Sequence, residues 1–433
     1  MIRNFFTGEK MVSDWITDGC LGVIVLTGIC DVIRHAMLGA WIPVITMLLI
    51  QICFFLIAAI ARKGHQPWWM AIPCAAAIVL FFYMNNIGTT LYNSGLLVTA
   101  AASGVWTVAG IVMLFMKKDH IKRFPIKEGC ALLSILCVFL MVWGASFWQA
   151  RNRQGHASGE IWGVPAQWDQ EAAVPQGTVE ELFYDTQAYA TDGRTVTKSV
   201  LVYLPAGYDE SKQYNILYMM HGTGDDQYYW LKTNPYNKVM LDNLIAAGEI
   251  EPLIVVTPTF YCENDCKGSL TALEKLTYAF KDELRNDLMP TVEAKYATYA
   301  ESADEAGFAA SRDHRAFAGL SRGAVTTYRS VFCGCLDYFA SFGTFSGSRT
   351  DAAYFKEHLQ SDAFAQYPIN YLYVSTGNFD FAMPQQLMDY HALLAAEPRL
   401  MEGSNTNFDI FPMRYHSMGD WHLALYNFLQ KIF

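Results

Sequence analysis

The most constraining feature of the sequence is a serine placed between two glycines, in the run AFAGLSRGAVT at residues 316–326. The residues before Ser321 form a short apolar run typical of a buried strand, and those after it have helical character. The spacing of Gly319, Ser321 and Gly323 permits a sharp strand-to-helix turn that lifts the serine oxygen clear of its neighbours. The motif therefore predicts a nucleophile, provided that the chain also supplies its partners.

A serine hydroxyl is a weak nucleophile until a histidine accepts its proton and a carboxylate holds that histidine in the correct tautomer. At a strand-turn-helix site of this kind, the chain order is serine, acid, histidine. Asp380 follows the apolar run INYLYVSTG and His416 follows NFDIFPMRY, so both occur in this order at the ends of expected strands. We therefore predict Ser321 as the nucleophile, Asp380 as the acid and His416 as the base.

Other acids and histidines compete for these roles. His422 lies close to His416 in sequence, but it falls inside an expected helix whose apolar face packs on a sheet. Among the acids, Asp409 falls inside an expected strand and Asp389 inside an expected helix, which favours Asp380. Three further histidines are interpreted as structural or exposed, namely His314, His358 and His391.

Acyl transfer also needs N–H donors for the oxyanion, one after the nucleophile and one from the loop after an earlier strand. The backbone N–H of Arg322 is the first candidate. The loop HGTG at 221–224 follows the apolar run ILYMM and supplies the second, with Thr223 as the expected donor. We expect His221 to pack rather than to act as a base. The sequence contains no His-Glu-x-x-His pair, Cys-x-x-Cys pair or acidic metal loop, so it implies no metal.

Strand-like runs alternate with helical segments from about residue 177 onward. The runs ELFYDTQAYATDG and TVTKSVLVYLP are joined at Asp192 and Gly193 in an expected hairpin. The runs YNILYMMHG, PLIVVTPTF, HRAFAGLS, INYLYVSTG and NFDIFPMRYH follow, with helices expected at 270–293 and 383–394. This alternation predicts an α/β domain with a central, mostly parallel sheet covered on both faces, where ligands bind at the carboxyl ends of the strands.

The first 150 residues have a different character, because they hold several apolar stretches near the ~20 residues that a helix needs to cross a bilayer. The first stretch is the weakest, since Asp18 and Asp31 lie in or beside it, and a re-entrant or peripheral helix is the alternative there. We predict an α-helical transmembrane region of about five spans within residues 1–150, at 16–33, 41–61, 67–84, 95–116 and 130–148.

The charges of the loops indicate an orientation for these spans. Residues 117–128 hold five Lys or Arg, whereas residues 85–94 carry no charge. Basic loops stay cytoplasmic, so the fifth span is expected to run outward and to place the rest of the chain outside the cell membrane. Residues 151–176 are polar with scattered Gly, Pro and Trp, and are interpreted as a linker before a domain at 177–433.

The net charge argues against some partners. The chain holds 31 Lys or Arg and 41 Asp or Glu, of which ten and six fall in residues 1–150, leaving 21 and 35 for the remainder. A net charge of −14 on that part argues against nucleic acid or an anionic membrane surface as its partner. We expect an ester substrate and no nucleic acid, and the oligomeric state stays open.

Residues from about 176 to 433 resemble the esterase family that includes feruloyl esterases, acetyl-xylan esterases, esterase D and the mycolyltransferases. The resemblance rests on VYLPAGYDESKQYNILYMMHG, FKDELRNDLMPTVEAKYATYA, FAGLSRGAVTTYRSVF, CLDYFASFGTFSG and HSMGDWHLALYNFLQ. It implies an α/β-hydrolase fold, a serine mechanism without cofactors, and ester substrates that are often acyl groups on polysaccharide. The family commonly has Met where this chain has Arg322, and the acid turn here is GNFDF, which leaves the alignment of Asp380 open by a residue or two.

Aromatic residues gather on the loops after two expected strands. Tyr228, Trp230 and Phe260 are predicted to bind the substrate, by stacking on a phenolic acyl group or a sugar, and ordinary loop packing is the alternative.

Four cysteines lie in the C-terminal part of the chain. If this part faces outward, disulfides between them can persist. Cys262 and Cys266 are close enough in sequence to close a small loop, and the pairing of these two with Cys333 and Cys335 stays open.

Together these features predict a membrane-anchored, externally facing serine carboxylic-ester hydrolase that acts through an acyl-enzyme on feruloyl or acetyl esters of polysaccharide. One alternative is an envelope acyltransferase of the mycolyltransferase type, which passes the acyl group to a sugar hydroxyl. Another is a membrane protein whose external domain binds glycan without catalysis, which the full set of Ser321, Asp380 and His416 disfavours.

Overall fold

The computed structural model describes residues 159–262, 270–378, 380–412 and 414–433, together with positions 52 and 56. The chain divides into two units, Met1–Gln149 and Ala150–Phe433. Apart from positions 52 and 56, the five predicted membrane spans lie outside the described residues. Within the part of the chain that the structure describes, no helix is both long and apolar enough to cross a bilayer.

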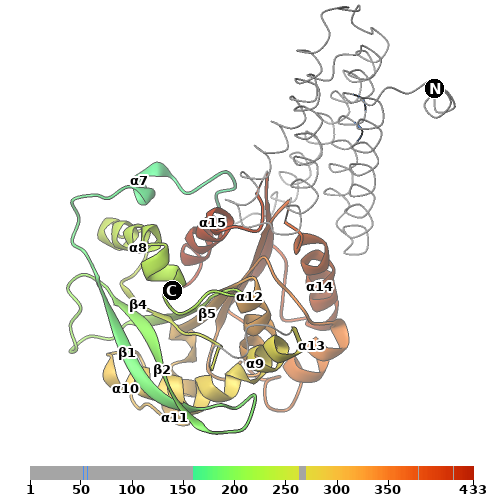
Figure 1. The fold of residues 1–433 in the computed structure, drawn as a ribbon, viewed down its shortest axis with the longest axis horizontal. Coiled ribbons are helices and arrows are strands. Elements are labelled where there is room, and N and C mark those ends of the chain that lie inside the picture. The colour runs from blue at the N-terminus through green and yellow to red at the C-terminus, as the bar shows by residue number, and fades with distance from the viewer. Residues whose placement is uncertain (1–51, 53–55, 57–158, 263–269, 379, 413) are drawn as a thin grey trace, which may run out of the picture. The chain divides into compact units, whose positions relative to one another are not determined.

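The second unit is built on an eight-stranded mixed sheet, with the strand order β1-β2-β4-β3-β5-β6-β7-β8 (Figure 1). β1 and β2 form the expected antiparallel hairpin, and β2 is also antiparallel to β4. All pairings from β4 through β3 to β8 are parallel, which confirms the prediction of a mostly parallel sheet. The strands are β1 (Thr178–Gln187), β2 (Thr195–Leu204), β3 (Asn215–Met220), β4 (Leu253–Thr257), β5 (Arg315–Leu320), β6 (Ser341–Phe345), β7 (Tyr371–Gly377) and β8 (Thr406–Phe411).

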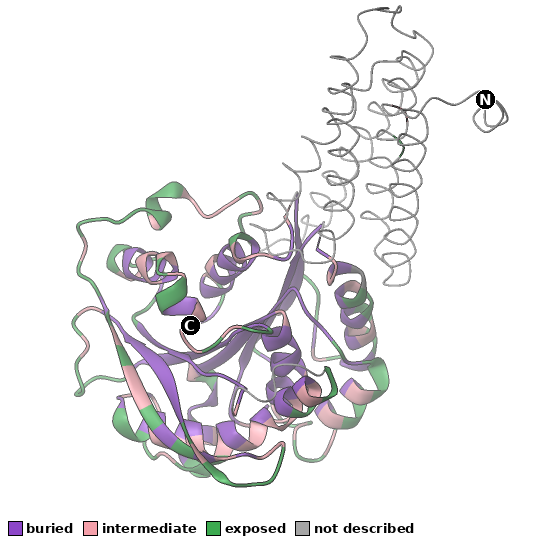
Figure 2. Ribbon diagram, viewed as in Figure 1, coloured by how far each residue is buried: buried purple, intermediate pink, exposed green. Residues whose placement is uncertain are grey.

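Helices cover both faces of this sheet because successive side chains of a strand point to opposite faces. Ile216 and Tyr218 of β3 join a cluster with apolar residues of α9, α10, α13 and α14. Leu217 and Met219 join a second cluster with α8 and α15. Strands β3 to β8 are buried throughout, whereas β1 at the edge and the first residues of β2 are partly exposed (Figure 2). These helices are α8 (Tyr236–Ala247), α9 (Leu270–Glu283), α10 (Met289–Lys295), α13 (Ala352–Leu359), α14 (Met383–Ala396) and α15 (Met418–Leu429).

The helix predicted at 270–293 is present but is not continuous. It begins as α9, passes through a π-helical turn at Leu284–Leu288, and continues as α10. The helix predicted at 383–394 is α14, which ends two residues later, at Ala396. A short α11 (Glu305–Ala310) then precedes β5, and its N-cap Asp304 accepts a hydrogen bond from the N–H of Gly307 at 3.0 Å.

Residues 159–176, which belong to the predicted linker, form a strap that packs on α8 and α15 of the same unit. Asn427 of α15 brackets Glu160, accepting from its N–H at 2.9 Å and donating to its carbonyl oxygen at 2.7 Å. Asn243 of α8 donates to the carbonyl oxygens of Trp168 and Gln170 at 3.0 and 2.9 Å. A single-turn helix, α7 (Ala166–Asp169), lies within this strap. The strap is therefore held by the helices of this unit, and the start of the esterase domain at residue 177 stays a prediction.

Two of the cysteines considered above are buried thiols in the core. Cys333 and Cys335 follow a π-helical segment at Thr327–Phe332 and are free. Burial raises the pKa of both thiols, that of Cys335 to about 12, so neither is a reactive thiolate at neutral pH. They act as small apolar residues here. Cys266 lies outside the described residues, so its pairing with Cys262 stays a prediction.

Candidate active site

Ser321 occupies a strained turn between β5 and α12 (Arg322–Thr326). Its backbone φ of 52° and ψ of −111° form a combination that residues other than glycine rarely adopt. The turn is held by the N–H of Ser321, which donates to the carbonyl oxygen of Phe345 at 2.8 Å, and by the N–H of Ala324, which donates to the carbonyl oxygen of Ser321 at 3.1 Å. The serine stands at the carboxyl end of β5 and at the start of a helix.

Glycines around Ser321 are required by close backbone approach. A Cβ on Gly319 would lie 2.3 Å from the carbonyl carbon of Gly323, and one on Gly323 would lie 2.5 Å from the carbonyl oxygen of Met220. A Cβ on Gly347, in the loop after β6, would lie 2.2 Å from the carbonyl oxygen of Ser321. Because the contacted atoms are backbone, they cannot move independently. Both glycines of the motif are therefore needed for α12 to pack against β3 and β5.

His416 links the serine to a carboxylate. Its Nε2 lies 2.9 Å from Ser321 Oγ, and its Nδ1 lies 3.0 Å from each carboxylate oxygen of Asp380. An ionised carboxylate only accepts, so Nδ1 carries the proton and Nε2 accepts from the serine hydroxyl. The imidazole is held between the ring of Phe381, with centroids 4.3 Å apart, and the edge-on ring of Trp421, at 5.0 Å.

Asp380 is placed by the loops after β7 and β8. It is 1% exposed, and one of its oxygens accepts a hydrogen bond from the N–H of Ala382 at 2.7 Å. A Cβ on Gly377, the last residue of β7, would lie 2.2 Å from the carbonyl oxygen of Arg414. The two loops therefore cross in backbone contact, which brings Asp380 next to His416. The structure thus brings together the three residues predicted from the motif, Asp380, His416 and Ser321.

The competing residues are engaged elsewhere. His422 is buried in α15, with Nδ1 2.6 Å from Asn237 Oδ1 and Nε2 2.5 Å from Asp169 Oδ1 in the strap. Burial lowers the pKa of His422, although Asp169 opposes this. Asp409 accepts from the Tyr373 hydroxyl at 2.8 Å, and Asp389 accepts from the Ser348 hydroxyl at 2.5 Å. Of the two histidines in question, it is His416 that contacts Ser321.

The loop after β3 approaches the nucleophile. A Cβ on Gly222 would lie 3.4 Å from Ser321 Cβ, so the backbone that leads to Thr223 passes beside the serine. His221 is fully buried and holds this loop through two hydrogen bonds. Its Nδ1 donates to the carbonyl oxygen of Gly222, and its Nε2 accepts from the Thr259 hydroxyl, both at 2.7 Å. Within the described residues, no backbone acceptor takes the N–H of Thr223 or that of Arg322. These two donors remain the candidates for the oxyanion.

Two of the three aromatic residues predicted to bind the substrate are core residues instead. Trp230 is fully buried, and its indole N–H donates to the carbonyl oxygen of Met220 at 3.1 Å. Phe260 is 1% exposed and packs its ring on His221, with centroids 4.6 Å apart. Neither ring presents a face to a ligand, which corrects the prediction. Tyr228 is half-buried, and its hydroxyl donates to Glu181 at 2.5 Å.

Sequence reasoning missed Asp225, a carboxylate beside the nucleophile. A Cβ on Gly222 would lie 3.0 Å from Asp225 Oδ2, so the carboxylate flanks the loop next to Ser321. Burial raises the pKa of Asp225 to about 6, and hydrogen bonding with the backbone of Gly222 opposes this. The signal in the sequence was the acidic pair DD at 225–226, directly after the loop HGTG.

Asp420, in the first turn of α15, is a second missed residue. It is fully buried, and its Oδ2 accepts from the Ser346 hydroxyl at 3.1 Å. Ser346 itself has a φ of 57°, an uncommon conformation outside glycine. Burial raises the pKa of Asp420 well above its usual range, and the negative charge of Asp380 adds to this. The carboxylate of Asp380 therefore has a second carboxyl group as its neighbour.

This arrangement can transfer a proton from Ser321 to His416 while Asp380 stabilises the charge that forms on the imidazole. Nothing in it requires a metal, and no group of three or more His, Cys, Asp or Glu residues that could hold one occurs in the described ranges. The chemistry available to these side chains is nucleophilic attack on a carbonyl carbon, followed by release of an alcohol.

Comparison with known proteins places this unit among esterases. The Esterase family model matches residues 196–354. Residues of the chain are 48% identical, over 151 residues, to endo-1,4-beta-xylanase Y of Acetivibrio thermocellus, and 30% identical, over 214 residues, to an endo-1,4-beta-xylanase/feruloyl esterase of Xylanibacter ruminicola. These matches cover 35% and 47% of this chain but 13% and 25% of the two relatives. The chain therefore matches only a part of each.

Two solved structures are matched over nearly their whole length. A mutant of the feruloyl esterase module from Clostridium thermocellum, complexed with sinapinate, is 32% identical with a TM-score of 0.55, and the match covers 64% of this chain and 94% of the module. A ferulic acid esterase from the anaerobic fungus Anaeromyces mucronatus, in complex with ferulic acid, shares the fold with a TM-score of 0.50 at 19% identity, over 64% of this chain and 98% of that one. The chain therefore belongs to the esterase family that contains the feruloyl esterase modules, and its second unit is a feruloyl esterase-like carboxylic ester hydrolase with the α/β-hydrolase fold.

Proposed function

We propose that this protein releases feruloyl or acetyl groups from acylated polysaccharide through an acyl-enzyme on Ser321. The observation that carries the proposal is the hydrogen-bonded series from Asp380 through His416 to Ser321, at distances of 2.9 and 3.0 Å, on a strained serine. Similarity to a feruloyl esterase module over nearly the whole length of that module supports the acyl group. The names of the two xylanase relatives support a polysaccharide as the alcohol.

The reaction follows from the positions of the protons. Ser321 Oγ forms a bond to the ester carbonyl carbon as its proton passes to His416 Nε2, and the oxyanion accepts hydrogen bonds from the N–H groups of Arg322 and Thr223. His416 then gives this proton to the departing alcohol oxygen, which leaves an acyl-enzyme. A water molecule loses a proton to the same nitrogen and attacks the acyl carbon. The bond from that carbon to Ser321 Oγ breaks as His416 returns the proton to Oγ, which releases the free acid and restores the serine hydroxyl.

We further propose that the enzyme is anchored in the cell membrane by residues 1–150 and acts outside it. Support comes from the apolar stretches of that region and from the five Lys or Arg of residues 117–128, which favour a cytoplasmic loop before the last span. An external position suits a polysaccharide substrate, which is too large to cross a membrane.

The test is a substrate panel on the full chain, purified in detergent. Feruloylated arabinoxylan oligosaccharides, acetylated xylo-oligosaccharides and aryl esters of longer fatty acids are compared by the free acid that each releases. We expect free ferulate or acetate, with the longer acyl esters cleaved poorly. A preference for long acyl chains would contradict the polysaccharide substrate. Transfer of the acyl group to an added glycan, instead of release as free acid, would favour the acyltransferase.

A further inference from the structure

Arg322, the residue after the nucleophile, has a buried guanidinium without a counter-ion. Arg322 is 6% exposed, and its Nη1 atom is enclosed without a hydrogen-bond partner. No hydrogen bond or ion pair of the Arg322 side chain is found among the residues that the structure describes. Burial, together with the positive charge of Arg349, lowers the pKa of the guanidinium, but arginine remains protonated at neutral pH. A buried charge without a partner is costly.

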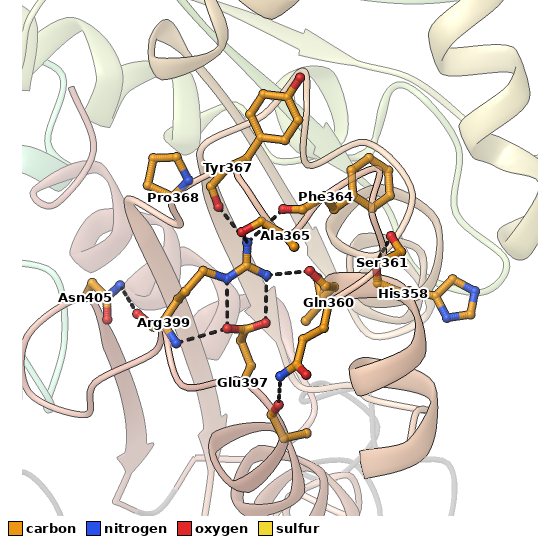
Figure 3. Close-up of polar contacts among 12 residues, drawn as sticks. His358, Gln360, Ser361, Phe364, Ala365, Tyr367, Pro368, Glu397, Arg399 and Asn405 are labelled. Atoms are coloured by element: carbon orange, nitrogen blue, oxygen red, sulfur yellow. Dashed lines mark hydrogen bonds and ion pairs between the residues drawn. The ribbon is translucent and has the colours of Figure 1, made fainter.

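Other buried or half-buried arginines of this unit show how such groups are usually satisfied. Arg315 bonds Glu293 through two nitrogens, at 2.8 and 2.7 Å, and also the carbonyl oxygens of Phe308 and Tyr338. Figure 3 shows Arg399 paired with Glu397 and surrounded by backbone carbonyl oxygens. Those carbonyl groups belong to Leu359, Phe364, Ala365 and Tyr367. Arg329 also has an enclosed Nε without a hydrogen-bond partner, but its guanidinium packs on the rings of Tyr278 and Tyr354. Among the described residues, Arg322 has neither an ionic partner nor a ring of this kind.

Among the described residues, the charges around Arg322 do not neutralise it. The acid that acts on its guanidinium is Glu274 of α9, and this carboxylate already binds Arg349 Nη1 at 2.8 Å. Two guanidinium groups therefore share one carboxylate, which leaves one positive charge in excess. Tyr261 and Tyr278 also act on the guanidinium, and neither is a carboxylate. An anion entering this region would find an unpaired fork of N–H donors.

This region lies on the active face of the sheet. Arg322 is bonded directly to the nucleophile, and Tyr261 follows β4 and accepts a hydrogen bond from the N–H of Gly224, in the loop of the oxyanion candidates, at 2.9 Å. Arg349 lies in the loop after β6, two residues beyond Gly347, which contacts the Ser321 backbone. We propose that the Arg322 guanidinium binds a carboxylate carried by the substrate, so that the enzyme prefers anionic esters. This inference rests on the proposed ester hydrolysis and specifies its substrate class.

The carboxylate has two possible sources on an ester. It belongs either to the acyl part, as in a half-ester of a dicarboxylic acid, or to the alcohol part, as in a sugar acid. In both cases a carboxylate accepts two parallel N–H bonds from a guanidinium, and these charge-assisted bonds strengthen where water is excluded. The acyl arm of the test compares 4-nitrophenyl hydrogen adipate with its neutral methyl ester. The alcohol arm compares 4-carboxyphenyl acetate with its neutral methyl ester.

The measurement is kcat/KM of the full chain for each anionic ester and for its neutral match. We expect the anionic ester to be preferred in one arm. Arg322→Met should lower the ratio of kcat/KM for the anionic ester to kcat/KM for its neutral match by roughly 10- to 100-fold, as for the loss of a hydrogen bond to a charged group. Arg322→Lys should retain part of the preference, because it keeps the charge but loses the fork. Added salt should weaken the wild-type preference for the anionic ester only slightly, because salt screens a buried ion pair much less than an exposed one.

The matched control is Arg329→Met, in the π-helical segment that directly follows α12. It removes a guanidinium that packs on the rings of Tyr278 and Tyr354. It should leave the ratio of anionic to neutral ester unchanged. If Arg322→Met changes both esters equally in both arms, the guanidinium has a structural role and the inference is wrong. If the wild type cleaves no ester in either arm but releases ferulate or acetate in the substrate panel above, the inference alone is wrong. If it cleaves nothing in either experiment, the proposed function itself fails, so the two failures are distinguishable.

Discussion

At the scale of single residues, the reactivity of Ser321 depends on the proton of His416. Asp380 fixes that proton on Nδ1, and this leaves Nε2 as the acceptor that the serine hydroxyl requires. Phe381 and Trp421 hold the ring between them, so the imidazole cannot rotate away. Each of these contacts orients the base before a substrate arrives, which is how a preorganised site lowers a barrier.

The two histidines of the C-terminal region should therefore behave differently. His416→Ala removes the base and should lower kcat by about 1,000-fold or more. His422→Ala removes contacts with Asn237 and the strap residue Asp169, so it should lower the unfolding temperature while kcat stays within a few fold. Steady-state kinetics and thermal unfolding of both variants provide the check. A greater loss of turnover from His422→Ala would show that the base is misassigned.

The buried Asp420 carboxyl predicts a pH-dependent stability. Its pKa is raised in the folded state, so this group favours the fold below its unfolded pKa, and this contribution is lost as the pH rises through the folded pKa. Asp420→Asn removes the titrating group, so the free energy of unfolding of the variant does not fall with pH for this reason. The difference between variant and wild type should grow from pH 4 upward by about 1.4 kcal/mol per pH unit, until the folded pKa of Asp420 is reached. Denaturant unfolding of both proteins at pH 4 and 7 measures this. A variant less stable at pH 7 than at pH 4, relative to wild type, would contradict it.

At the scale of elements, the site depends on how closely α12 approaches β3 and β5. Gly323→Ala would place a methyl group 2.5 Å from the carbonyl oxygen of Met220, and that backbone is fixed by two neighbouring strands. We expect loss of several kcal/mol of stability, or an insoluble protein, because overpacking against backbone cannot relax. Gly163→Ala is the matched control, since its Cβ would meet only the flexible Arg414 side chain, at 3.4 Å. Equal unfolding midpoints for the two variants would contradict the packing argument.

The sequence was informative wherever an element repeats or a motif has fixed geometry. The alternation of strands and helices predicted the parallel sheet, and the order of Ser321, Asp380 and His416 predicted residues that the fold brings within hydrogen-bond distance. Each of the three follows a strand, and the carboxyl ends of parallel strands meet at one edge. Such inferences need only periodicity and chain order.

The sequence was less informative in irregular segments. The strap at 159–176 has no periodicity, and its backbone is satisfied by Asn243 and Asn427, which are far away along the chain. Trp230 and Phe260 lie in or near loops where no pattern tells an inward side chain from an outward one. Asp225 and Asp420 become notable only through the burial that the fold imposes. Tertiary contacts decide all of these positions.

At the scale of the whole molecule, we propose that residues 1–150 anchor the esterase unit in the membrane. Its orientation is testable with single cysteines introduced at residues 117–128 or 151–158 of the full chain and treated with an impermeant thiol reagent in intact cells. We expect labelling above the background of the unaltered chain only at 151–158, because the basic loop favours the cytoplasm. Labelling of the 117–128 loop alone would place the esterase in the cytoplasm and discard the polysaccharide substrate.

The central claim, that Ser321 carries an acyl group during ester hydrolysis, is tested most directly by Ser321→Ala in the full chain. Turnover of methyl ferulate is compared for the two proteins after thermal unfolding has shown that both are folded. We expect the variant to lose turnover by about 1,000-fold or more, because the nucleophile and its hydrogen bond with His416 are both absent. A folded variant that kept half of the wild-type turnover would contradict the assignment of Ser321 and the mechanism built on it.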